Sequence, residues 1–575
     1  MKGIASLFLI ALVVPLLGVR GNPWPATDGL GRKLPGAEAV GPVRRDRTVS
    51  LFYFLWQYAH TKSGPHDISK ILSEHPEALT NAAHPAWGPK NAYHHYAEPL
   101  FGYYRSTDEW VYRKHAEMLA DAGVDVIVFD ASNGYTYKES YMALCRTFDQ
   151  ARKDGVKVPK IAFLCMFGPV NPKEIEELYK DFYKTGLYKD LWFHWKGKPL
   201  IMAYPEGTSE EVRSFFTFRP AMPTYFDGPS RPDHWSWLQT YPQHAFGGTA
   251  EQPEQMAVGV AQNVADGKIS ASSHPRSQGR SFHNGEMDER PEACKYGLNF
   301  QEQWDHALKA DPELIFVTGW NEWVAMRMDK FAGYEAPVVF VDAFNLEHNR
   351  DIEPVKGGYG DNYYYQMISN IRRFKGMDSP EPAGPAKPIA IDGDFSDWKE
   401  VRPEFTDYRG DTQHRDTPGW GDQLHYTNTQ GRNDIVLSKV SRDAENLTFY
   451  VKTAAPLSPA SDPSWMRLFI DADRSRETGW EGYDFVLNRT APGALEKSSN
   501  GWNWSKVDDA KFIVRGSEME ISIPRSSLDL PEGQPLDIEF KWVDNLNREG
   551  DIMDFYTCGD AAPGGRFNYR YFEAE

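Results

Sequence analysis

The chain has 575 residues, more than one hydrophobic core can organise, so we expect two or three domains. Its formal net charge of −18 argues against nucleic acids and anionic membrane surfaces as partners. Aromatic residues make up 14% of the sequence and include 18 Trp, and aromatic surface is one means by which proteins bind carbohydrate.

The first 21 residues have the pattern of a secretory signal peptide. A short charged start is followed by an apolar run (4–19) and small residues near Gly21. The run contains Pro15 and is short for a membrane span, and no other apolar run approaches ~20 residues. We expect cleavage near Gly21, export to the periplasm or the extracellular space, no membrane span and a monomer.

The four cysteines match no zinc pattern. Cys145 and Cys165 are expected to be buried thiols, and a disulfide between Cys294 and Cys558 stays open at this point.

After a linker or strap rich in Gly, Pro and Arg (22–48), apolar runs alternate with amphipathic segments. The runs predict strands at 49–56, 124–130, 160–166, 199–204, 215–219, 235–238, 256–262 and 314–318. Eight such units over about 270 residues are typical of a (β/α)8 barrel, which we expect over 49–376. The loop 57–107 carries several histidines, which are interpreted as surface hydrogen-bonding residues rather than metal ligands.

A proline-rich linker (377–388) precedes a change of pattern. From 389 to 575 short alternating segments are separated by turn residues at roughly ten-residue spacing, which predicts an all-β sandwich.

Trp320-Asn-Glu-Trp323 follows directly on the apolar run that ends at Thr318. Active sites of α/β barrels lie at the carboxyl ends of their strands, and a carboxylate between two indoles suits sugar chemistry. We therefore expect Glu322 to act as a general acid/base. Because glycoside hydrolysis usually needs two carboxyl groups, Asp130 and Glu206 are candidate partners, and Glu353 could reach the site from the next loop. The expected sugar contacts are Trp56, Tyr58, Asn133, Trp320, Asn321 and Trp323.

Three segments resemble the barrels of glycoside hydrolase families 71 and 99. They are Ala122-Gly-Val-Asp-Val-Ile-Val-Phe-Asp130 with Asn133, Gly319-Trp-Asn-Glu-Trp323, and Arg350-Asp-Ile-Glu-Pro354 with Gly360-Asp-Asn-Tyr-Tyr364. Family 99 contains retaining endo-α-mannosidases and endo-α-mannanases, and family 71 contains α-1,3-glucanases, so the resemblance implies an α-linked mannan or glucan. In family 99 a second Glu follows three residues after the first. Here that position is Ala325, so only Glu322 carries over and the second carboxylate is unassigned.

The C-terminal region resembles carbohydrate-binding module family 9. The resemblance rests on Pro388-Ile-Ala-Ile-Asp-Gly-Asp-Phe-Ser-Asp-Trp398, Asn446-Leu-Thr-Phe-Tyr450 and Phe469-Ile-Asp-Ala-Asp473. It implies a β-sandwich, often with calcium. Trp480, Trp502 and Trp504 are candidate sugar platforms, and Asp471 and Asp473 are either Ca²⁺ ligands or turn residues. No cofactor is expected for the barrel.

Two functions follow from these patterns. The first is a secreted glycoside hydrolase that acts on a polysaccharide or glycan through Glu322. The alternative is a non-catalytic glycan-binding protein built on a degenerate hydrolase barrel, and Ala325 motivates it.

Overall fold

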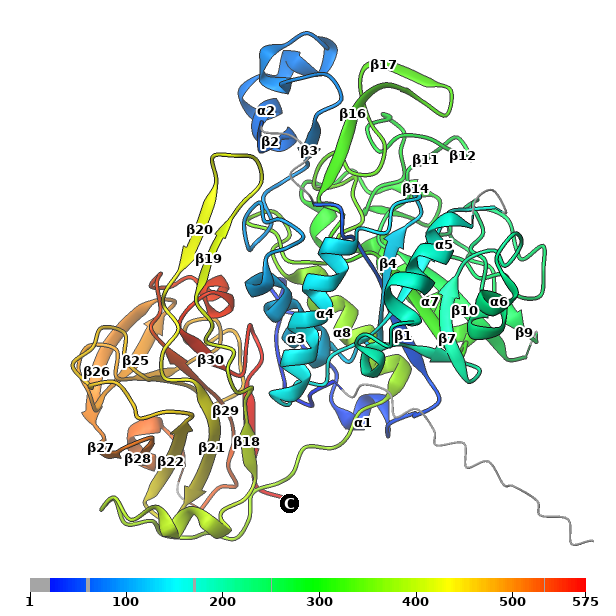
Figure 1. Ribbon diagram of the computed structural model, residues 1–575. Helices are drawn as coiled ribbons and strands as arrows, with labels where there is room; N and C mark the ends of the chain where they lie inside the picture. Colours follow the sequence, from blue (N-terminus) through cyan, green and yellow to red (C-terminus); the bar gives the residue numbers. More distant parts are fainter. Residues whose placement is uncertain (1–20, 58–62, 169–171, 250, 532, 575) are drawn as a thin grey trace, which may run out of the picture.

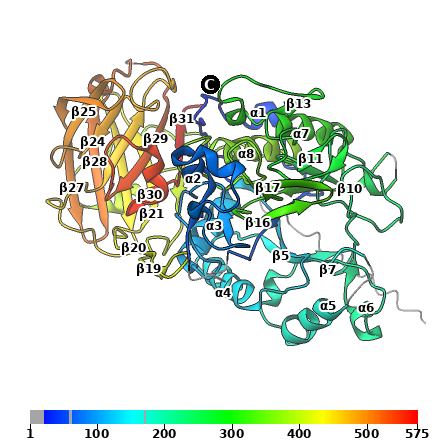
Figure 2. The ribbon, with the colours of Figure 1, turned by 90° about the horizontal axis from the view of Figure 1, so that it is seen from above.

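The computed structural model describes residues 21–57, 63–168, 172–249, 251–531 and 533–574 (Figure 1). Residues 1–20 of the expected signal peptide therefore lie outside the described residues, and so does Tyr58, one of the expected sugar contacts. No helix among the described residues is long and apolar enough to cross a membrane. The chain is a mixed α/β protein whose N-terminal part (21–376) and C-terminal part (389–574) lie side by side (Figures 1 and 2).

A parallel sheet of buried apolar strands forms the centre of the N-terminal part. Its order is β7, β5, β4, β1, β15, β10, with β8 also paired to β7 and with antiparallel β6 and β9 beside β7 and β10. The strands are β1 (Thr48–Tyr53), β4 (Val126–Ala131), β5 (Lys160–Cys165), β6 (His194–Trp195), β7 (Lys198–Met202), β8 (Thr217–Phe218), β9 (Phe246–Gly248), β10 (Pro253–Gly259) and β15 (Leu314–Thr318). β6 and β9 were not predicted. The other strands coincide with predicted apolar runs, although their first and last residues differ from the predicted ones.

The expected strand at 235–238 differs from the others. Trp235 makes a single parallel bridge to Ala221. Beyond it, the main-chain N–H and C=O of Ser236 bond to the side-chain amide of Gln255 in β10, at 2.9 and 2.7 Å. A buried amide side chain thus takes the place of a backbone ladder where the two ends of the sheet approach each other.

Helices follow the strands and surround the sheet (Figure 2). The sequence sets their ends, as α3 (Glu109–Ala122) shows: the Asp108 side chain accepts the Val111 N–H at 3.3 Å, and Gly123 ends the helix with φ 78°. The other helices are α1 (Ala37–Val40), α2 (Ile68–Glu74), α4 (Lys138–Lys153), α5 (Lys173–Leu178), α6 (Glu210–Phe215), α7 (Leu298–Ala310) and α8 (Asn362–Lys375).

A small sheet stands beyond the carboxyl end of β15, in the order β17, β16, β3, β2 (Figure 1). Its strands are β2 (His66–Asp67), β3 (Tyr93–His95), β16 (Val324–Phe331) and β17 (Tyr334–Phe340). Two short hairpins, β11 (Val264–Ala265) with β12 (Lys268–Ile269) and β13 (Phe282–His283) with β14 (Glu286–Met287), lie between β10 and α7. The loop expected at 57–107 is therefore largely structured.

Two of its histidines, His94 and His95, are almost fully buried, which corrects the interpretation of them as surface residues. Burial lowers the pKa of both imidazoles to about 3, so they are neutral core groups.

Two antiparallel sheets form most of the C-terminal part and share one core. Residues that alternate along the strands meet between the sheets, for example Leu447 and Phe449 from one sheet and Leu468 and Ile470 from the other. The first sheet contains β18 (Glu404–Thr406), β21 (Ile435–Arg442), β22 (Asn446–Thr453), β28 (Glu518–Pro524) and β27 (Lys511–Arg515). The second contains β26 (Asn503–Asp509), β25 (Ala494–Asn500), β24 (Phe485–Leu487), β23 (Arg467–Asp471), β29 (Asp537–Asp544), β30 (Asp560–Ala562) and β31 (Tyr569–Phe572).

The strap after residue 21 packs against both parts. The Trp24 ring lies 5.8 Å from the Phe567 ring and 5.5 Å from the Tyr569 ring, and its carbonyl accepts a hydrogen bond from Arg372 of α8 at 2.7 Å. All four cysteines are free, so the open pairing of Cys294 with Cys558 is not formed, and Cys145 and Cys165 are buried thiols as expected.

A hairpin of the C-terminal part, β19 (Arg415–Pro418) with β20 (His425–Asn428), reaches over the start of α3 (Figure 1). Arg415 donates to the Asp108 carboxylate at 2.6 and 2.9 Å, and the two side chains are only 7% and 1% exposed. Asp108 also caps α3, so one buried ion pair joins a helix cap of the N-terminal part to the hairpin.

Replacing Arg415 by Ala should lower the free energy of unfolding by about 3–5 kcal/mol, because it leaves the buried Asp108 carboxylate unpaired. Arg276→Ala is the matched control, since Arg276 pairs with Asp266 at 2.5 Å but is 69% exposed and should cost less than about 1 kcal/mol. Urea unfolding of both variants measures the difference. Equal effects of the two changes would mean that the Arg415 pair does not join the parts.

Candidate active site

Glu322 lies four residues after the end of β15, at the carboxyl ends of the parallel strands. Its main-chain N–H donates a short hydrogen bond to Asp351 Oδ1, which sets the direction of the chain as it leaves the strand. The residue is buried, with 4% of its surface exposed. The expected position of Glu322 at a strand end is thus observed.

Arg350 connects Glu322 to a second carboxylate. Its Nε and Nη2 donate to Glu322 Oε2 at 3.0 and 2.6 Å, and the same Nη2 donates to Asp342 Oδ1 at 3.0 Å. Nη1 donates to Asn263 Oδ1 at 3.1 Å. The guanidinium also lies 5.7 Å from the ring centroid of Trp237. A buried cation therefore holds one buried carboxylate and one partly exposed one, since the Asp342 side chain is 35% exposed.

The electrostatic environment of Glu322 has two opposing parts. Burial raises the pKa of its carboxyl well above the usual range, and the Arg350 guanidinium acts in the opposite direction. Arg350 engages Oε2, and no hydrogen bond to Oε1 is found among the described residues. The carboxyl group is thus oriented through one oxygen, and the other remains available for a proton.

Asp130 faces the same space and Glu206 does not. Asp130 ends β4, is 4% exposed, and accepts the Ser132 N–H at 3.0 Å. Burial raises the pKa of Asp130, the charge of Asp342 acts in the same direction, and Arg350 acts in the opposite one. Glu206 lies in an exposed loop and pairs with Arg231 at 2.7 Å.

The polar and aromatic neighbours of Glu322 turn away from solvent. The Asn321 amide bonds to the backbone of Phe54 at 2.8 and 3.2 Å and so ties the end of β15 to the end of β1. Trp320 and Trp323 are 0% exposed, and Trp323 stacks on Tyr96 with ring centroids 5.0 Å apart. As core residues, these two indoles have no accessible face to offer a sugar, and their expected contact with sugar stays a prediction.

Glu353 is also directed into the core. Its carboxylate accepts hydrogen bonds from Tyr104 and Trp323 at 2.7 and 2.5 Å and lies 3.0 Å from His115 Nε2. It has no exposed surface, so the arrangement supports a structural role.

Other aromatic residues line the side where Asp342 is exposed. Trp56 is 9% exposed, its ring lies 5.5 Å from that of Tyr93, and its indole N–H has no hydrogen-bond partner among the described residues. The same holds for the indole N–H of Trp237, whose ring lies 5.8 Å from Phe167. Asn133 is exposed near Tyr137. Two buried donors without partners are suited to hydroxyl groups of a ligand.

Beneath the site, Arg280 fixes the segment that carries Arg350. Its guanidinium lies between Tyr359 and Tyr363, at 4.3 and 4.1 Å from their ring centroids, and Nη2 bonds to Asn349 and to the Asp351 carbonyl. Burial raises the pKa of Asp351 to about 8, against the opposing charge of Arg280. The chain on both sides of Arg350 is thus held before any ligand binds.

The C-terminal part has its own aromatic cluster. Trp480 is 6% exposed and packs against Trp502, with centroids 4.4 Å apart, and Trp502 and Trp504 are partly exposed. Phe469 of β23 lies beneath them, on the face opposite to the shared core. The accessible candidates for a sugar platform are therefore Trp502 and Trp504 more than Trp480.

Asp471 and Asp473 form a group with Asp484, with ligand atoms within 4.8 Å of one another. An all-oxygen set of this kind fits Ca²⁺. His75, Glu77 and His84 also come together, but His84 Nδ1 accepts the Ala86 N–H at 3.3 Å, which favours a proton on Nε2 and disfavours metal binding there.

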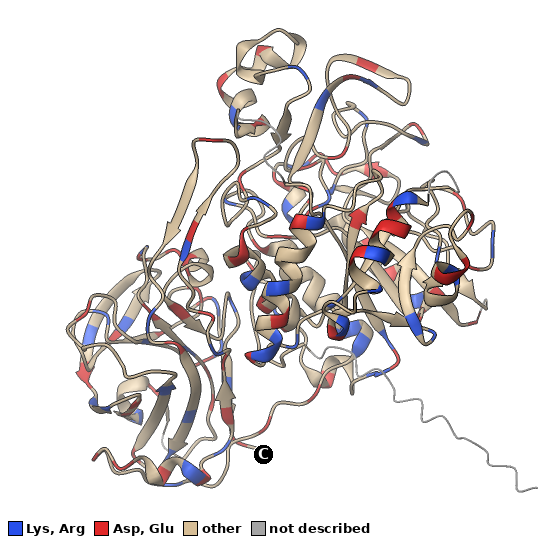
Figure 3. Ribbon diagram, viewed as in Figure 1, with Lys and Arg blue, Asp and Glu red and all other residues tan. Residues whose placement is uncertain are grey.

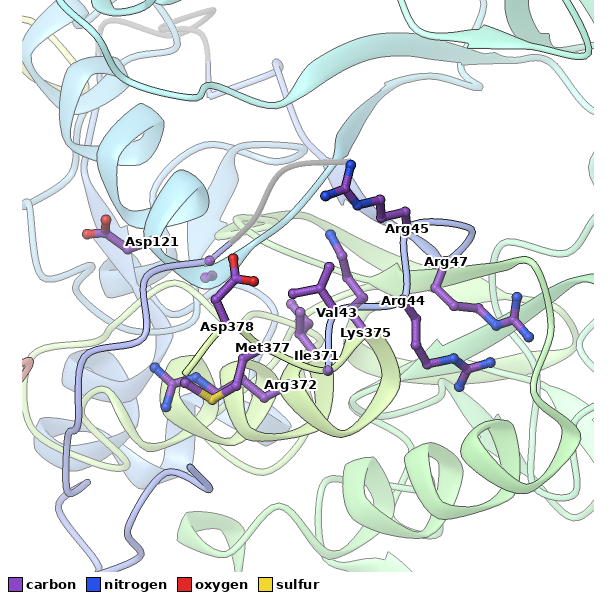
Figure 4. Close-up of a pocket in the computed structure, with 13 residues that line it drawn as sticks. Val43, Arg44, Arg45, Arg47, Asp121, Ile371, Arg372, Lys375, Met377 and Asp378 are labelled. Carbon is purple, nitrogen blue, oxygen red and sulfur yellow. The ribbon is translucent and has the colours of Figure 1, made fainter. Parts of the chain in front are cut away.

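A cavity also opens at the opposite end of the parallel strands, before β1 and β4 (Figure 4). Three of its cations are engaged: Arg44 and Arg47 pair with Asp311, and Arg372 donates to main-chain carbonyls. Acidic and basic residues are distributed along the whole described chain (Figure 3). This cavity lies away from Glu322 and has no part in its chemistry.

Sequence reasoning missed Asp342 and the role of Arg350. Asp342 follows the apolar end of β17, and the same signal had pointed to Asp130. Arg350 stands in the segment quoted for the family resemblance, but nothing in the sequence pairs it with Glu322. Ala325, the departure from that family, is 1% exposed and paired with His94 inside the small sheet.

Comparisons with known proteins assign this chain to no family. The sequence matches no family profile and no curated protein. Two solved structures of the GH99 endo-α-mannosidase from Bacteroides thetaiotaomicron, one of them in complex with bis-tris propane, are similar at 15% and 16% identity. Each comparison covers 57% of this chain and 97% of the other, with a TM-score of 0.31.

Asp351→Asn should make stability less dependent on pH. The native state keeps a proton on Asp351 up to a pKa of about 8, whereas the unfolded chain releases it near pH 4. The stability that this proton contributes is full below pH 4 and is lost as the pH rises to 8. The variant's amide oxygen still accepts the Glu322 N–H. The free energy of unfolding of the variant, relative to that of the wild type, should therefore increase by about 2–4 kcal/mol from pH 5 to pH 8.

Urea unfolding at the two pH values measures this gain, with the exposed Asp529→Asn as the control that should show none. A difference between variant and wild type that is the same at both pH values would contradict the assignment.

Proposed function

We propose that this chain is a glycoside hydrolase that cleaves a neutral polysaccharide or glycan with Glu322 as general acid/base and Asp342 as its partner carboxylate. The observation that supports this most is that one buried arginine, Arg350, holds both carboxylates. Asp342 takes the place that Asp130 and Glu206 were expected to fill, and Asp130 adds negative charge nearby.

The spacing of the two carboxylates favours retention of configuration. Their contacting oxygens bond to the same nitrogen at 2.6 and 3.0 Å, so they cannot lie farther apart than these two contacts laid end to end. That limit concerns the two arginine-bound oxygens, and it is close to the ~5–5.5 Å that separates the carboxyl groups of retaining enzymes.

The two carboxylates then have separate roles. Glu322 donates its proton to the glycosidic oxygen as that C–O bond breaks, and the Asp342 carboxylate bonds to the anomeric carbon. Glu322 then removes a proton from water, which attacks the same carbon and releases Asp342. The raised pKa of Glu322 suits the first step, and the exposed edge of Asp342 suits the attack.

The finer architecture belongs to the same proposal. We interpret 49–376 as a (β/α)8 barrel whose gap at 235–238 is closed by Gln255, and 389–575 as a β-sandwich that binds sugar. The start of the sequence supports export by a signal peptide. The resemblance of short motifs makes α-linked mannan and glucan the first substrates to test.

A non-catalytic glycan-binding protein is the second candidate. One observation favours it: Glu322 is only 4% exposed and its Oε2 is fully engaged by Arg350, so a substrate oxygen has little access to it. In this case the partnerless indole N–H groups of Trp56 and Trp237 would serve binding alone.

For the C-terminal part we propose glycan binding on Trp502 and Trp504, with Ca²⁺ held by Asp471, Asp473 and Asp484 close to the chain turn that follows β23. The supporting observations are the exposed edges of the two indoles and the three clustered carboxylates.

Glu322→Gln and Asp342→Asn should each lower kcat by at least about 10²-fold on the hydrolysed glycan, because each removes one of two groups that act in the same step. Glu210→Gln, an exposed change on α6, should leave kcat unchanged. Release of reducing ends measures kcat, and the first-formed anomer, read by NMR, should keep the configuration of the substrate.

Full activity of folded Glu322→Gln would remove Glu322 from the reaction. Binding of glycans without release of reducing ends, over a panel of α-mannans and α-glucans, would support the second candidate instead.

Trp502→Ala should weaken binding of the polysaccharide by roughly 3–10-fold, since it removes one aromatic face of the cluster. Val507→Ala on the neighbouring strand β26 is the control and should leave affinity unchanged. Affinity electrophoresis in gels containing the polysaccharide measures both. Equal mobility of the two variants would place the sugar platform elsewhere.

A further inference from the structure

Three aspartates meet where the C-terminal part contacts helix α3. Asp407 and Asp411 lie between β18 and β19, and Asp560 begins β30. One oxygen of each lies within 4.8 Å of the others. Asp411 and Asp560 are 8% and 5% exposed, so this group is largely removed from water.

These carboxylates form no direct ion pair in the described part of the chain. No ion pair within 4.0 Å joins Asp407, Asp411 or Asp560 to a cation in the described part of the chain. Asp560 Oδ2 accepts the Ile435 N–H at 2.6 Å, but Asp411 Oδ1 and Asp407 Oδ2 have no hydrogen-bond partner among the described residues. A carboxylate oxygen that is nine-tenths buried and unbonded is costly, and it needs an explanation.

The surrounding charged groups do not explain why these oxygens lack hydrogen-bond partners. Lys114 donates to the main-chain carbonyl of Asp411 at 3.4 Å and lies 3.8 Å from Glu117 Oε2, and Lys541 donates to the carbonyl of Pro563, so neither ammonium bonds to a carboxylate of the group. The acidic residues Glu117, Asp121 and Asp434 lie nearby, and Asp434 Oδ1 is also without a partner. The group therefore carries an excess of negative charge.

The same residues line a cavity. Asp407, Asp411 and Asp560 border it from the C-terminal part, and Lys114 and Glu117 border it from α3. The three carboxylates thus belong to residues that border this cavity.

We propose that Asp407, Asp411 and Asp560 bind a divalent cation, Ca²⁺, at the contact between the two parts of the chain. The donor set consists of oxygen only, which Ca²⁺ prefers. This site is separate from the group at Asp471, and it depends on neither the proposed hydrolysis nor the proposed sugar platform.

The cation would hold the loop that docks on α3. In that loop Tyr408 donates to Asp121 at 2.7 Å, and the Arg409 carbonyl accepts a hydrogen bond from Arg113 at 2.9 Å. Asp407 and Asp411 flank these two residues. Binding Ca²⁺ would therefore connect this loop to β30 and strengthen the docking of the C-terminal part on the helix.

Without a cation, the three carboxylates must hold protons or repel one another. Replacing Asp411 by Asn has opposite consequences in the two states: it relieves repulsion when the site is empty, and it removes a ligand when Ca²⁺ is bound.

The test is the thermal midpoint of the full chain, with EDTA and with CaCl2. All proteins carry Asp473→Asn, which weakens the other acidic group. In this background Ca²⁺ should raise Tm by roughly 5 °C at a hundredfold excess over Kd. Adding Asp411→Asn should remove that rise, and it should raise Tm in EDTA but lower it in Ca²⁺ relative to the background protein.

Titration calorimetry gives a second measurement that needs no change in the proposed ligands. The Asp473→Asn protein should bind one Ca²⁺ at this site. No bound Ca²⁺, or a rise in Tm that survives Asp411→Asn, would overturn the proposal. If Asp411→Asn does not fold, calorimetry decides: zero bound Ca²⁺ overturns the proposal, and one Ca²⁺ that is still bound after Asp471→Asn is added to the background supports it.

Discussion

The guanidinium of Arg350 is the interaction on which the candidate site depends. A buried arginine keeps its charge, so the fold must supply acceptors, and it supplies Glu322, Asp342 and Asn263 from three separate segments. The three segments are β15, the end of β17 and the turn before β11, so their relative positions follow from the sheet. Because the cation binds one oxygen of each carboxylate, it orients both groups toward the same space. The chemistry proposed for the site follows from that orientation.

Further buried contacts position the segments on either side of Arg350 and Glu322. Asp351 accepts a hydrogen bond from the Glu322 N–H. The guanidinium of Arg280, which lies between two tyrosines, donates to the carbonyl of Asp351. On the other side, Asn321 ties β15 to β1, and Trp323 stacks on Tyr96 from the loop before α3. The residues that first suggested a sugar site are thus mostly the framework that positions Glu322, and the indole N–H groups of Trp56 and Trp237 are among the polar groups left for a ligand.

Much of this fold could be predicted because buried parallel strands are apolar runs and their helices have clear ends. The runs predicted at 124–130 and 314–318, which form β4 and β15, are examples. The segment at 235–238 was predicted as a strand, but its pairing depends on the side chain of Gln255, which no periodic pattern reveals. Likewise, the position of Glu322 could be predicted from the strand that precedes it. Its pairing with Arg350 and Asp342 could not, because it depends on loops far apart in sequence. The burial of Trp320 and Trp323 was missed for the same reason.

The contact between the two parts depends on buried charges as much as on apolar surface. Arg415 pairs with the residue that caps α3, and the acidic group at Asp411 lies beside the same helix. Helix α3 in turn carries His115, which contacts Glu353 and the ring of Trp320. A physical path of buried contacts therefore runs from the C-terminal part to the strand end that carries Glu322.

A double-mutant cycle on kcat tests the central claim, that Arg350 makes Glu322 and Asp342 act as one unit. The variants are Arg350→Met, Glu322→Gln and the two together, assayed on the hydrolysed glycan after circular dichroism has shown each to be folded. If the account is correct, the double variant loses no more activity than the more damaged single variant, because either change dismantles the same unit. Losses that multiply in the double variant, or an Arg350→Met protein with wild-type kcat, would contradict it.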